Sequence, residues 1–329
     1  MRKKLLYYVV MFGLALSFFS CSSGSKNTSV NKDTIITADA IIKKLKVWKQ
    51  LQPIVVRDKH VVGFLAFVKA GYPNKTLSIS PIYIDKDITF INCVFEDSVS
   101  AYHVNPENKS VVYTVFEKNV TFNSCTFKKG VNFMQSDFQT RFSFDVCKVE
   151  GQADFSGCSF RLGNSFVQTG FDDDVLFVST TFIGRCNFFK VLFKKTACFQ
   201  YCRFNDISMF TDGYFYGYTE FSKIFSSAVL DFTNVKFSGR TLFCNSLFLS
   251  NIKLAKCVFK NDFSFTGNSV FGELNLKQAE IQQKTIFRDN SFSKQPETTD
   301  LKKGKDFASE DFGNVIVPVS KINVINLKK

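Results

Sequence analysis

Large apolar residues recur at alternating spacings of five and six from Phe122 to Phe292, which defines an 11-residue repeat. Of the 32 repeat slots in this stretch, 26 hold Phe, and the one polar residue is Ser226. Five residues advance an α-helix by about 500°, so successive Phe side chains would point to opposite sides of a helix. The intervening Thr, Ser, Asn, Gly and Val residues are poor helix formers. The pattern therefore predicts short extended segments joined by corners.

A second selective position lies two residues before each repeat Phe and holds a small or apolar residue, such as Ala153 before Phe155. Alternate residues of an extended segment point to the same side. Each segment is therefore predicted to turn one small residue and one Phe inward. The polar residues between and after them face outward.

Three repeat units carry a resemblance to a known family, since residues 131–133 read Val-Asn-Phe, 153–155 read Ala-Asp-Phe and 186–188 read Cys-Asn-Phe. They resemble the pentapeptide-repeat family, whose unit is Ala-(Asp/Asn)-(Leu/Phe)-x-x, although the units here alternate five and six residues. The resemblance covers residues 122–292, about half of the chain. It implies an all-β fold, a right-handed quadrilateral β-helix in which two of the repeats close one coil. This stretch would then form roughly eight coils, each about 4.8 Å high.

The same resemblance implies that Phe side chains two repeats apart, such as Phe155 and Phe177, stack on one another and fill the interior. A solenoid of this kind needs caps, because each coil contacts only its neighbours. Residues 39–52 read as an amphipathic helix with Thr37 as N-cap, and we predict that it covers the first coil. An alternative is a helix that contacts a membrane or a partner, because four lysines lie opposite the apolar face: Lys43, Lys44, Lys46 and Lys49.

The flanks of the repeat are less regular. Residues 37–121 are predicted to hold the capping helix and the first irregular coils, with a protruding loop near residues 105–108. Residues 293–329 read as a polar linker followed by a terminal strand pair at 315–319 and 322–327.

Residues 1–21 read as a signal peptide, with a basic start, an unbroken apolar run from Leu5 to Phe19, and Ser20-Cys21 at its end. That run is short for a membrane span. The end of the run resembles the lipobox of bacterial lipoproteins, which implies lipidation of Cys21 and a lipid anchor in the membrane. Residues 22–36 would form a flexible tether. The predicted location is the cell envelope, at the outer membrane, either periplasmic or surface-exposed; a soluble secreted protein and an uncleaved membrane anchor are the alternatives.

The formal charge is +13, and loss of Arg2, Lys3 and Lys4 with the signal leaves 13 − 3 = +10. A basic surface favours anionic partners such as lipid head groups or an anionic glycan, although the charge can also serve solubility alone. Nucleic-acid mimics of the resembled family need an acidic surface. The export signal also disfavours a nucleic-acid partner.

Nine cysteines remain after Cys21, and six occupy the small inward position. Buried free cysteine behaves as a small apolar residue, so packed thiols are expected. The pair Cys125 and Cys147, two repeats apart, is the best candidate for a disulfide. The six inward cysteines are Cys125, Cys147, Cys158, Cys186, Cys202 and Cys257.

No cofactor or metal site is predicted. His60 and His103 lie far apart in the sequence and belong to no ligand-spaced cluster. The consecutive acids Asp172, Asp173 and Asp174 are weak candidates for Ca²⁺ binding through oxygen ligands, or for a glycan-cleaving acid pair with Glu150.

The candidate binding surface is a run of outward tyrosines, Tyr214, Tyr216 and Tyr218. A shift of two repeats in either direction places cations beside them, namely Lys236 at Tyr214, Lys194 at Tyr216 and Arg240 at Tyr218. Aromatic rings beside cations can grip a protein or stack on a sugar. The alternative is an aromatic ladder that only supports the sheet.

Together these features predict a non-enzymatic envelope lipoprotein whose β-helix is a rigid scaffold or binding surface for a protein or glycan. One alternative is a glycan-active β-helix enzyme, which needs paired acids on one face. The other is a nucleic-acid mimic or a nucleic-acid-binding repeat protein.

Overall fold

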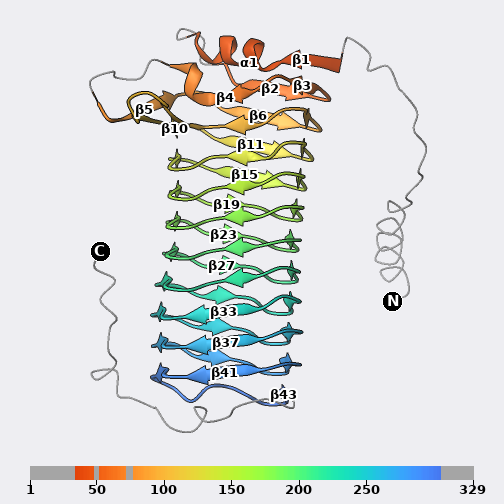
Figure 1. Cartoon of the computed structure of the whole chain (residues 1–329), viewed down its shortest axis with the longest axis vertical. Coiled ribbons are helices and arrows are strands. Elements are labelled where there is room, and N and C mark those ends of the chain that lie inside the picture. Colours follow the sequence, from red (N-terminus) through yellow and green to blue (C-terminus); the bar gives the residue numbers. More distant parts are fainter. Residues whose placement is uncertain (1–33, 48–51, 72–76, 305–329) are drawn as a thin grey trace, which may run out of the picture. The chain divides into compact units, whose positions relative to one another are not determined.

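The structure is a computed structural model that describes residues 34–47, 52–71 and 77–304. These residues form a stack of coils whose short strands build four parallel sheets (Figure 1). We name the four sheets A, B, C and D. Each coil adds one strand to each sheet, and along the chain the strands enter the sheets in the order B, A, C, D. The predicted all-β, four-sided solenoid with an N-terminal helix is therefore confirmed.

The helical elements are α1 (Ala38–Leu45) and the 3₁₀ turn η2 (Phe67–Ala70). Sheet A contains β1 (Ile35–Thr37), β3 (His60–Val62), β7 (Val94–Phe95), β12 (Thr126–Phe127), β16 (Lys148–Val149), β20 (Gly170–Phe171), β24 (Leu192–Phe193), β28 (Tyr214–Phe215), β32 (Lys236–Phe237), β36 (Val258–Phe259), β40 (Glu280–Ile281) and β43 (Lys302–Lys303). Sheet B contains β2 (Ile54–Arg57), β6 (Ile88–Ile91), β11 (Val120–Asn123), β15 (Phe142–Asp145), β19 (Asn164–Ser165), β23 (Cys186–Asn187), β27 (Ser208–Met209), β31 (Leu230–Asp231), β35 (Ile252–Lys253) and β39 (Leu274–Asn275).

The other two walls are built in the same way. Sheet C contains β4 (Leu65–Ala66), β8 (Val99–Ser100), β13 (Val131–Asn132), β17 (Ala153–Asp154), β21 (Val175–Leu176), β25 (Ala197–Cys198), β29 (Thr219–Glu220), β33 (Thr241–Cys244), β37 (Phe263–Thr266) and β41 (Thr285–Arg288). Sheet D contains β5 (Ile79–Ile84), β9 (Tyr102–Val104), β10 (Val111–Phe116), β14 (Asp137–Phe138), β18 (Ser159–Phe160), β22 (Thr181–Phe182), β26 (Arg203–Phe204), β30 (Phe225–Ser226), β34 (Leu247–Phe248), β38 (Ser269–Val270) and β42 (Ser291–Phe292).

The interior is filled by phenylalanine columns, in which successive rings come from positions two repeats apart. Phe155 and Phe177 stack with ring centroids 5.0 Å apart and 7° between planes, and Phe188 and Phe210 stack at 4.5 Å and 7°. Rings of neighbouring columns meet edge to face, as between Phe188 and Phe199 at 90°. These geometries are the favourable ones for aromatic pairs. The predicted stacking is therefore confirmed.

The broken slot Ser226 points inward and is buried, and its hydroxyl donates to the carbonyl of Ala228 at 2.7 Å. A polar residue is tolerated there because its donor has a partner within the same corner.

Within the repeat, one residue in every eleven adopts a left-handed backbone conformation at the B-to-A and C-to-D corners. Ser124 has a φ of 54°, Gln135 of 55° and Val146 of 55°. These corners lie in the five-residue steps. The six-residue steps turn at the other two corners, where left-handed residues are rare. The alternation of five and six thus corresponds to two kinds of corner.

In several repeats the small inward position before the second Phe has a polar role that the sequence did not reveal. Cys158 donates its thiol hydrogen to the carbonyl of Phe133 at 2.8 Å, and Thr180 donates to the carbonyl of Phe155 at 2.7 Å. Because buried carbonyls need partners, Cys, Thr, Ser and Asn are interchangeable there.

All nine cysteines of the described residues are free thiols. The expectation of packed thiols at the inward position is therefore confirmed, and Cys125 and Cys147, the best candidate for a disulfide, are not bonded to each other. The thiol of Cys125 donates to the carbonyl of Phe90 at 3.6 Å and that of Cys147 to the carbonyl of Phe122 at 3.5 Å.

The first coils are longer than the repeat coils. Ile54 pairs with Ile88, and Ile88 pairs with Val120. The side-chain bond from Asn92 to Asp58 joins neighbouring coils across a sequence separation of 34, and the bond from Asn119 to Asp87 does so across 32, whereas Asn234 and Asp212 in the repeat are separated by 22. Part of the extra length forms a hairpin in which β9 pairs antiparallel with β10.

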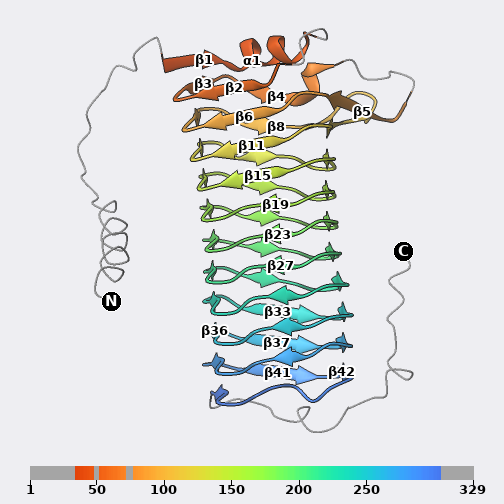
Figure 2. The same cartoon turned by 180° about the vertical axis from the view of Figure 1, so that it is seen from behind.

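The turn of this hairpin contains Asn105, which confirms the predicted protruding loop. Strand β5 pairs with β10 along its whole length and projects from the stack (Figure 2), while the last two residues of β10 pair with β14 in the next coil.

Helix α1 lies on the first coil. Its buried face, Ala38, Ile41, Ile42 and Leu45, packs against β4 and η2. The Thr37 hydroxyl accepts a hydrogen bond from the Ala40 N–H at 3.2 Å, as an N-cap does.

The helix ends at Leu45, earlier than the predicted residue 52, and residues 48–51 lie outside the described residues. The buried Lys86 ammonium satisfies the carbonyls at this end, since it donates to those of Lys44, Leu45 and Val47 at 3.0, 3.3 and 2.5 Å.

Two predicted boundaries need correction. The flexible tether was predicted to reach residue 36, but the apolar Ile35 and Ile36 belong to β1, which pairs with β3. The polar linker was predicted to start at residue 293, but β43 continues sheet A and Glu297 bridges to Asn275. Backbone pairing and the half-buried Leu301 suffice for a last coil without Phe.

Residues 1–33 and 305–329 lie outside the described residues, and with them Cys21, the signal peptide and the predicted terminal strands. Among the described residues, no helix is both long and apolar enough to cross a bilayer.

Candidate functional site

The corner between sheets A and C carries most of the candidate residues in successive coils, and we call it the A–C edge. The rows, each two repeats after the last, are Asp172-Asp173-Asp174, Lys194-Lys195-Thr196, Tyr216-Gly217-Tyr218 and Ser238-Gly239-Arg240. An acidic, a basic and an aromatic row therefore lie one above another. The register thus adds Asp172, Asp173 and Asp174 to the column in which Lys194 and the tyrosines were predicted to lie.

The acidic row is neutralised by the lysine row. Asp172 accepts from Lys194 at 2.7 Å and lies 3.5 Å from the Lys148 ammonium, while Asp173 accepts from Lys195 at 2.7 Å. Glu150 lies one coil before Asp172 and bonds Lys148 at 2.7 Å. Within the described residues, no group of acids, histidines and cysteines is arranged to hold a metal ion.

The electrostatics of Glu150 and Asp173 do not suit the role of a glycosidase general acid. The ammonium of Lys148 holds the pKa of Glu150 below its usual range, and Lys195 does the same for the pKa of Asp173. A glycosidase acid needs the opposite, a raised pKa that keeps the carboxyl protonated. The ladder of alternating charges instead ties neighbouring coils together.

The tyrosine patch, defined as Tyr214, Tyr216 and Tyr218, faces outward as predicted. Tyr216 is 54% exposed, and the rings of Tyr214 and Tyr216 stack with centroids 6.4 Å apart. Gly217 stands between the tyrosines because a Cβ there would clash with the carbonyl group of Lys195. The close approach of the two coils thus fixes how the flanking rings are presented.

The three predicted cations behave differently. Lys236 lies over the Tyr214 ring at 5.2 Å, which is a cation–π geometry. Lys194 is in the row next to Tyr216, but its ammonium bonds Asp172. Burial, together with the hydrogen bond from its hydroxyl to Glu220 at 2.9 Å, raises the pKa of Tyr218 to about 12, against a smaller lowering effect of Arg240. Tyr218 is therefore an un-ionised hydrogen-bond donor at neutral pH.

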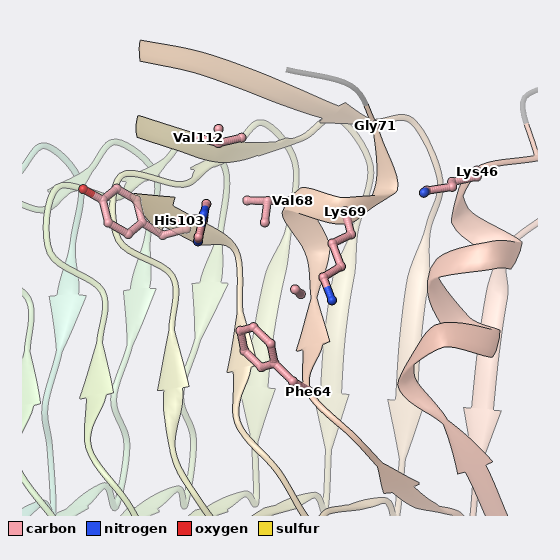
Figure 3. Close-up of a pocket in the computed structure, with 9 residues that line it drawn as sticks. Lys46, Phe64, Val68, Lys69, Gly71, His103 and Val112 are labelled. Carbon is pink, nitrogen blue, oxygen red and sulfur yellow. The ribbon is translucent and has the colours of Figure 1, made fainter. Parts of the chain in front are cut away.

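Sequence reasoning missed a pocket at the N-terminal end, beside the β9–β10 hairpin (Figure 3). Its volume is about 450 Å³. A second hollow of about 490 Å³ adjoins it, and the two share Phe64, Tyr102 and His103. No periodic signal could have found the pocket, since its walls come from the irregular coils. The remaining lining residues of the first pocket are Lys46, Ala66, Val68, Lys69, Gly71 and Val112.

The other histidine, His60, bonds Glu96 through Nδ1 at 2.7 Å, away from His103.

No protein-family model matches this chain, and neither a curated protein nor a solved structure matches it. Function must therefore be inferred from the fold and its surface chemistry. Two features of the described surface are suited to binding: the tyrosine patch on the A–C edge and the pocket beside the hairpin.

Proposed function

We propose that this chain is a lipid-anchored envelope protein of the pentapeptide-repeat type, whose solenoid is a rigid, non-catalytic scaffold presenting the tyrosine patch to an anionic glycan. The stacked and exposed pair of Tyr214 and Tyr216 is the observation that carries the proposal. A filled phenylalanine interior supports it, because such a core leaves binding to the outer walls.

The glycan is favoured over other partners by the chemistry of the patch. A sugar ring can stack on Tyr216, and acidic substituents would find the ammonium of Lys236 and the guanidinium of Arg240 nearby. A protein partner that uses the same tyrosines is the second candidate, since tyrosine and arginine are enriched in protein interfaces.

Binding to immobilised lipopolysaccharide tests the docking role. We expect the double variant Tyr214→Ala/Tyr216→Ala to bind at least about tenfold more weakly than the unchanged chain, as expected for central aromatic contacts. Tyr83→Ala is the matched control, because Tyr83 is 57% exposed but lies on β5. Equal retention of the double variant and the control would overturn the tyrosine patch as the glycan surface.

The anchor is tested separately by mass spectrometry of the mature N-terminus. We expect a diacylglyceryl group on Cys21 as the first residue, and release of Cys21→Ser from the membrane fraction. A mature chain that starts at another residue with a free amine would overturn the lipid anchor and leave the docking role standing.

A further inference from the structure

The pocket beside the β9–β10 hairpin is built by four separate segments. Lys46 follows α1, Phe64 precedes β4, Lys69 lies on η2, and His103 and Val112 face each other across β9 and β10 (Figure 3). Its volume of about 450 Å³ lies within the range of small-molecule sites. The regular coils contribute none of its lining residues.

The floor of the pocket is apolar. Ala66 and Val112 are buried beneath it, whereas Phe64 is 49% exposed at its side. Val68 is half-buried and completes the apolar surface. An exposed phenylalanine beside an apolar hollow leaves surface that a hydrocarbon chain would cover favourably.

The polar groups of the pocket have one sign of charge. Among the described residues, its lining includes the ammonium groups of Lys46 and Lys69, the imidazole of His103 and the hydroxyl of Tyr102, and no carboxylate. Lys69 lies 5.9 Å from the centroid of the Phe64 ring, at the boundary between floor and rim. Figure 3 shows Lys46 reaching from the end of α1 toward the side on which Lys69 lies.

We propose that this pocket binds a fatty acid, with the acyl chain on the Phe64 and Val68 floor and the carboxylate at the cationic rim to which Lys46 and Lys69 contribute. The cationic rim selects an anion, and the apolar floor selects a hydrocarbon body. The volume is at the small end of the range for ligand pockets, which suits one acyl chain rather than a two-chain lipid. The adjoining hollow, lined by Ser98, Asn132, Gln152 and Asp154, is polar and does not suit the chain.

Isothermal titration of the full chain with three twelve-carbon probes, each below its micellar concentration, tests the charge preference. The probes are dodecanoate, 1-dodecanol and dodecyltrimethylammonium. We expect dodecanoate to bind roughly tenfold more tightly than dodecanol, as a charge-assisted hydrogen bond provides, and the cation to bind most weakly. Equal affinities for the three probes would overturn the proposal.

Two variants locate the site. Lys46→Gln/Lys69→Gln should lose the preference for dodecanoate over dodecanol, because both lysines are exposed and their loss leaves the floor intact. Val68→Trp should fill the floor and weaken dodecanoate and dodecanol alike. The control Lys260→Gln/Lys277→Gln makes the same charge change on distant coils and should bind as the unchanged chain does.

A loss of preference in the control as large as in Lys46→Gln/Lys69→Gln would show a net-charge effect and overturn the pocket assignment. Unchanged dodecanoate binding by Val68→Trp would do the same. The lysine variant keeps the test decisive if the tryptophan variant fails to fold, and the unfolding midpoint of each variant distinguishes these cases.

Discussion

The repeat coils of residues 122–292 and the first coils of residues 34–121 are built on the same four sheets, but they differ in the length of chain that closes each coil. In the repeat, two 11-residue units close a coil, and the inward positions are filled by stacked rings. In the first coils a longer stretch of chain closes each coil, and the surplus forms η2, the β9–β10 hairpin and a pocket. A strict repeat therefore produces a solid rod with chemistry on its surface. Insertions into the same framework are what create a hollow.

The first coils also close the N-terminal end of the stack. In the first coils, β5 is the terminal strand of sheet D, and Pro81 stands in its middle. A proline at a sheet edge removes an N–H donor and discourages strand addition. Helix α1 packs over β4 and η2. The long coils thus also serve to close the end of the stack, which regular coils cannot do for themselves.

The sharpest way to break this comparison is to remove one ring from each region. Phe188→Ala should lower the free energy of unfolding by about 3–5 kcal/mol, because Phe188 is fully buried and stacks on Phe166 and Phe210 at 4.7 and 4.5 Å. Phe64→Ala should change it by less than about 0.5 kcal/mol, since nearly half of Phe64 is exposed. Denaturant unfolding measures both. Similar losses would mean that the stack does not carry the stability of the fold.

The cap of the first coils depends on one buried charge. Lys86→Met should cost about 2 kcal/mol, because three carbonyls at the end of α1 lose a charged donor that is only 3% exposed. Faster amide exchange in α1, with protection in the repeat unchanged, would locate the damage. The control Lys253→Met removes a lysine that is 42% exposed in the repeat. An equal effect of the control on α1 would contradict the role of Lys86.

How much the sequence could predict follows the same division. In the repeat, a step of two units finds the neighbour of any residue, so the stack of Phe155 on Phe177 and the place of Lys236 over Tyr214 were predictable. The donor role of Cys158 was not, because its carbonyl partner lies in the preceding coil and only the folded corner brings them together. In the first coils the strand pairing follows no constant sequence spacing. The contact of Lys86 with α1 and the walls of the pocket therefore depend on tertiary structure alone.

Because the repeat contains buried thiols, we expect the stability of the fold to fall at alkaline pH. Complete burial raises the pKa of Cys158 well above its ordinary value of 9.0. The folded thiol stays protonated while the unfolded one ionises. Its contribution to the free energy of unfolding is therefore fully present below pH 9 and is lost as the pH rises further. At pH 10 the unfolded state should gain about 1.4 kcal/mol from this residue.

Cys158→Thr isolates that contribution, because Thr169 in the next repeat unit and Thr180 in the next coil occupy the equivalent position and also donate to a carbonyl. The difference between the free energies of unfolding at pH 8 and pH 10 should shrink by about 1.4 kcal/mol in the variant. Cys244→Thr is the control, since Cys244 is only partly buried. An unchanged pH dependence in Cys158→Thr would contradict the burial argument.

The smallest expected effect concerns the left-handed corners, where the first coils use Asp and Asn and the repeat uses a wider range of residues that includes them. In the first coils the corner residues Asp58 and Asn92 tolerate positive φ, and their side chains bond each other at 2.8 Å. In the repeat, Val146 occupies the equivalent position with a φ of 55°, although a β-branched residue is strained there. Val146→Asn should therefore stabilise the fold by about 1 kcal/mol. Gly157→Ala is the reciprocal change: its φ is 69° and the added Cβ would meet no backbone atom closer than 3.8 Å, so strain alone should cost about 1 kcal/mol. If the two variants shift the unfolding midpoint in the same direction, corner strain is not what distinguishes the residues chosen at these positions.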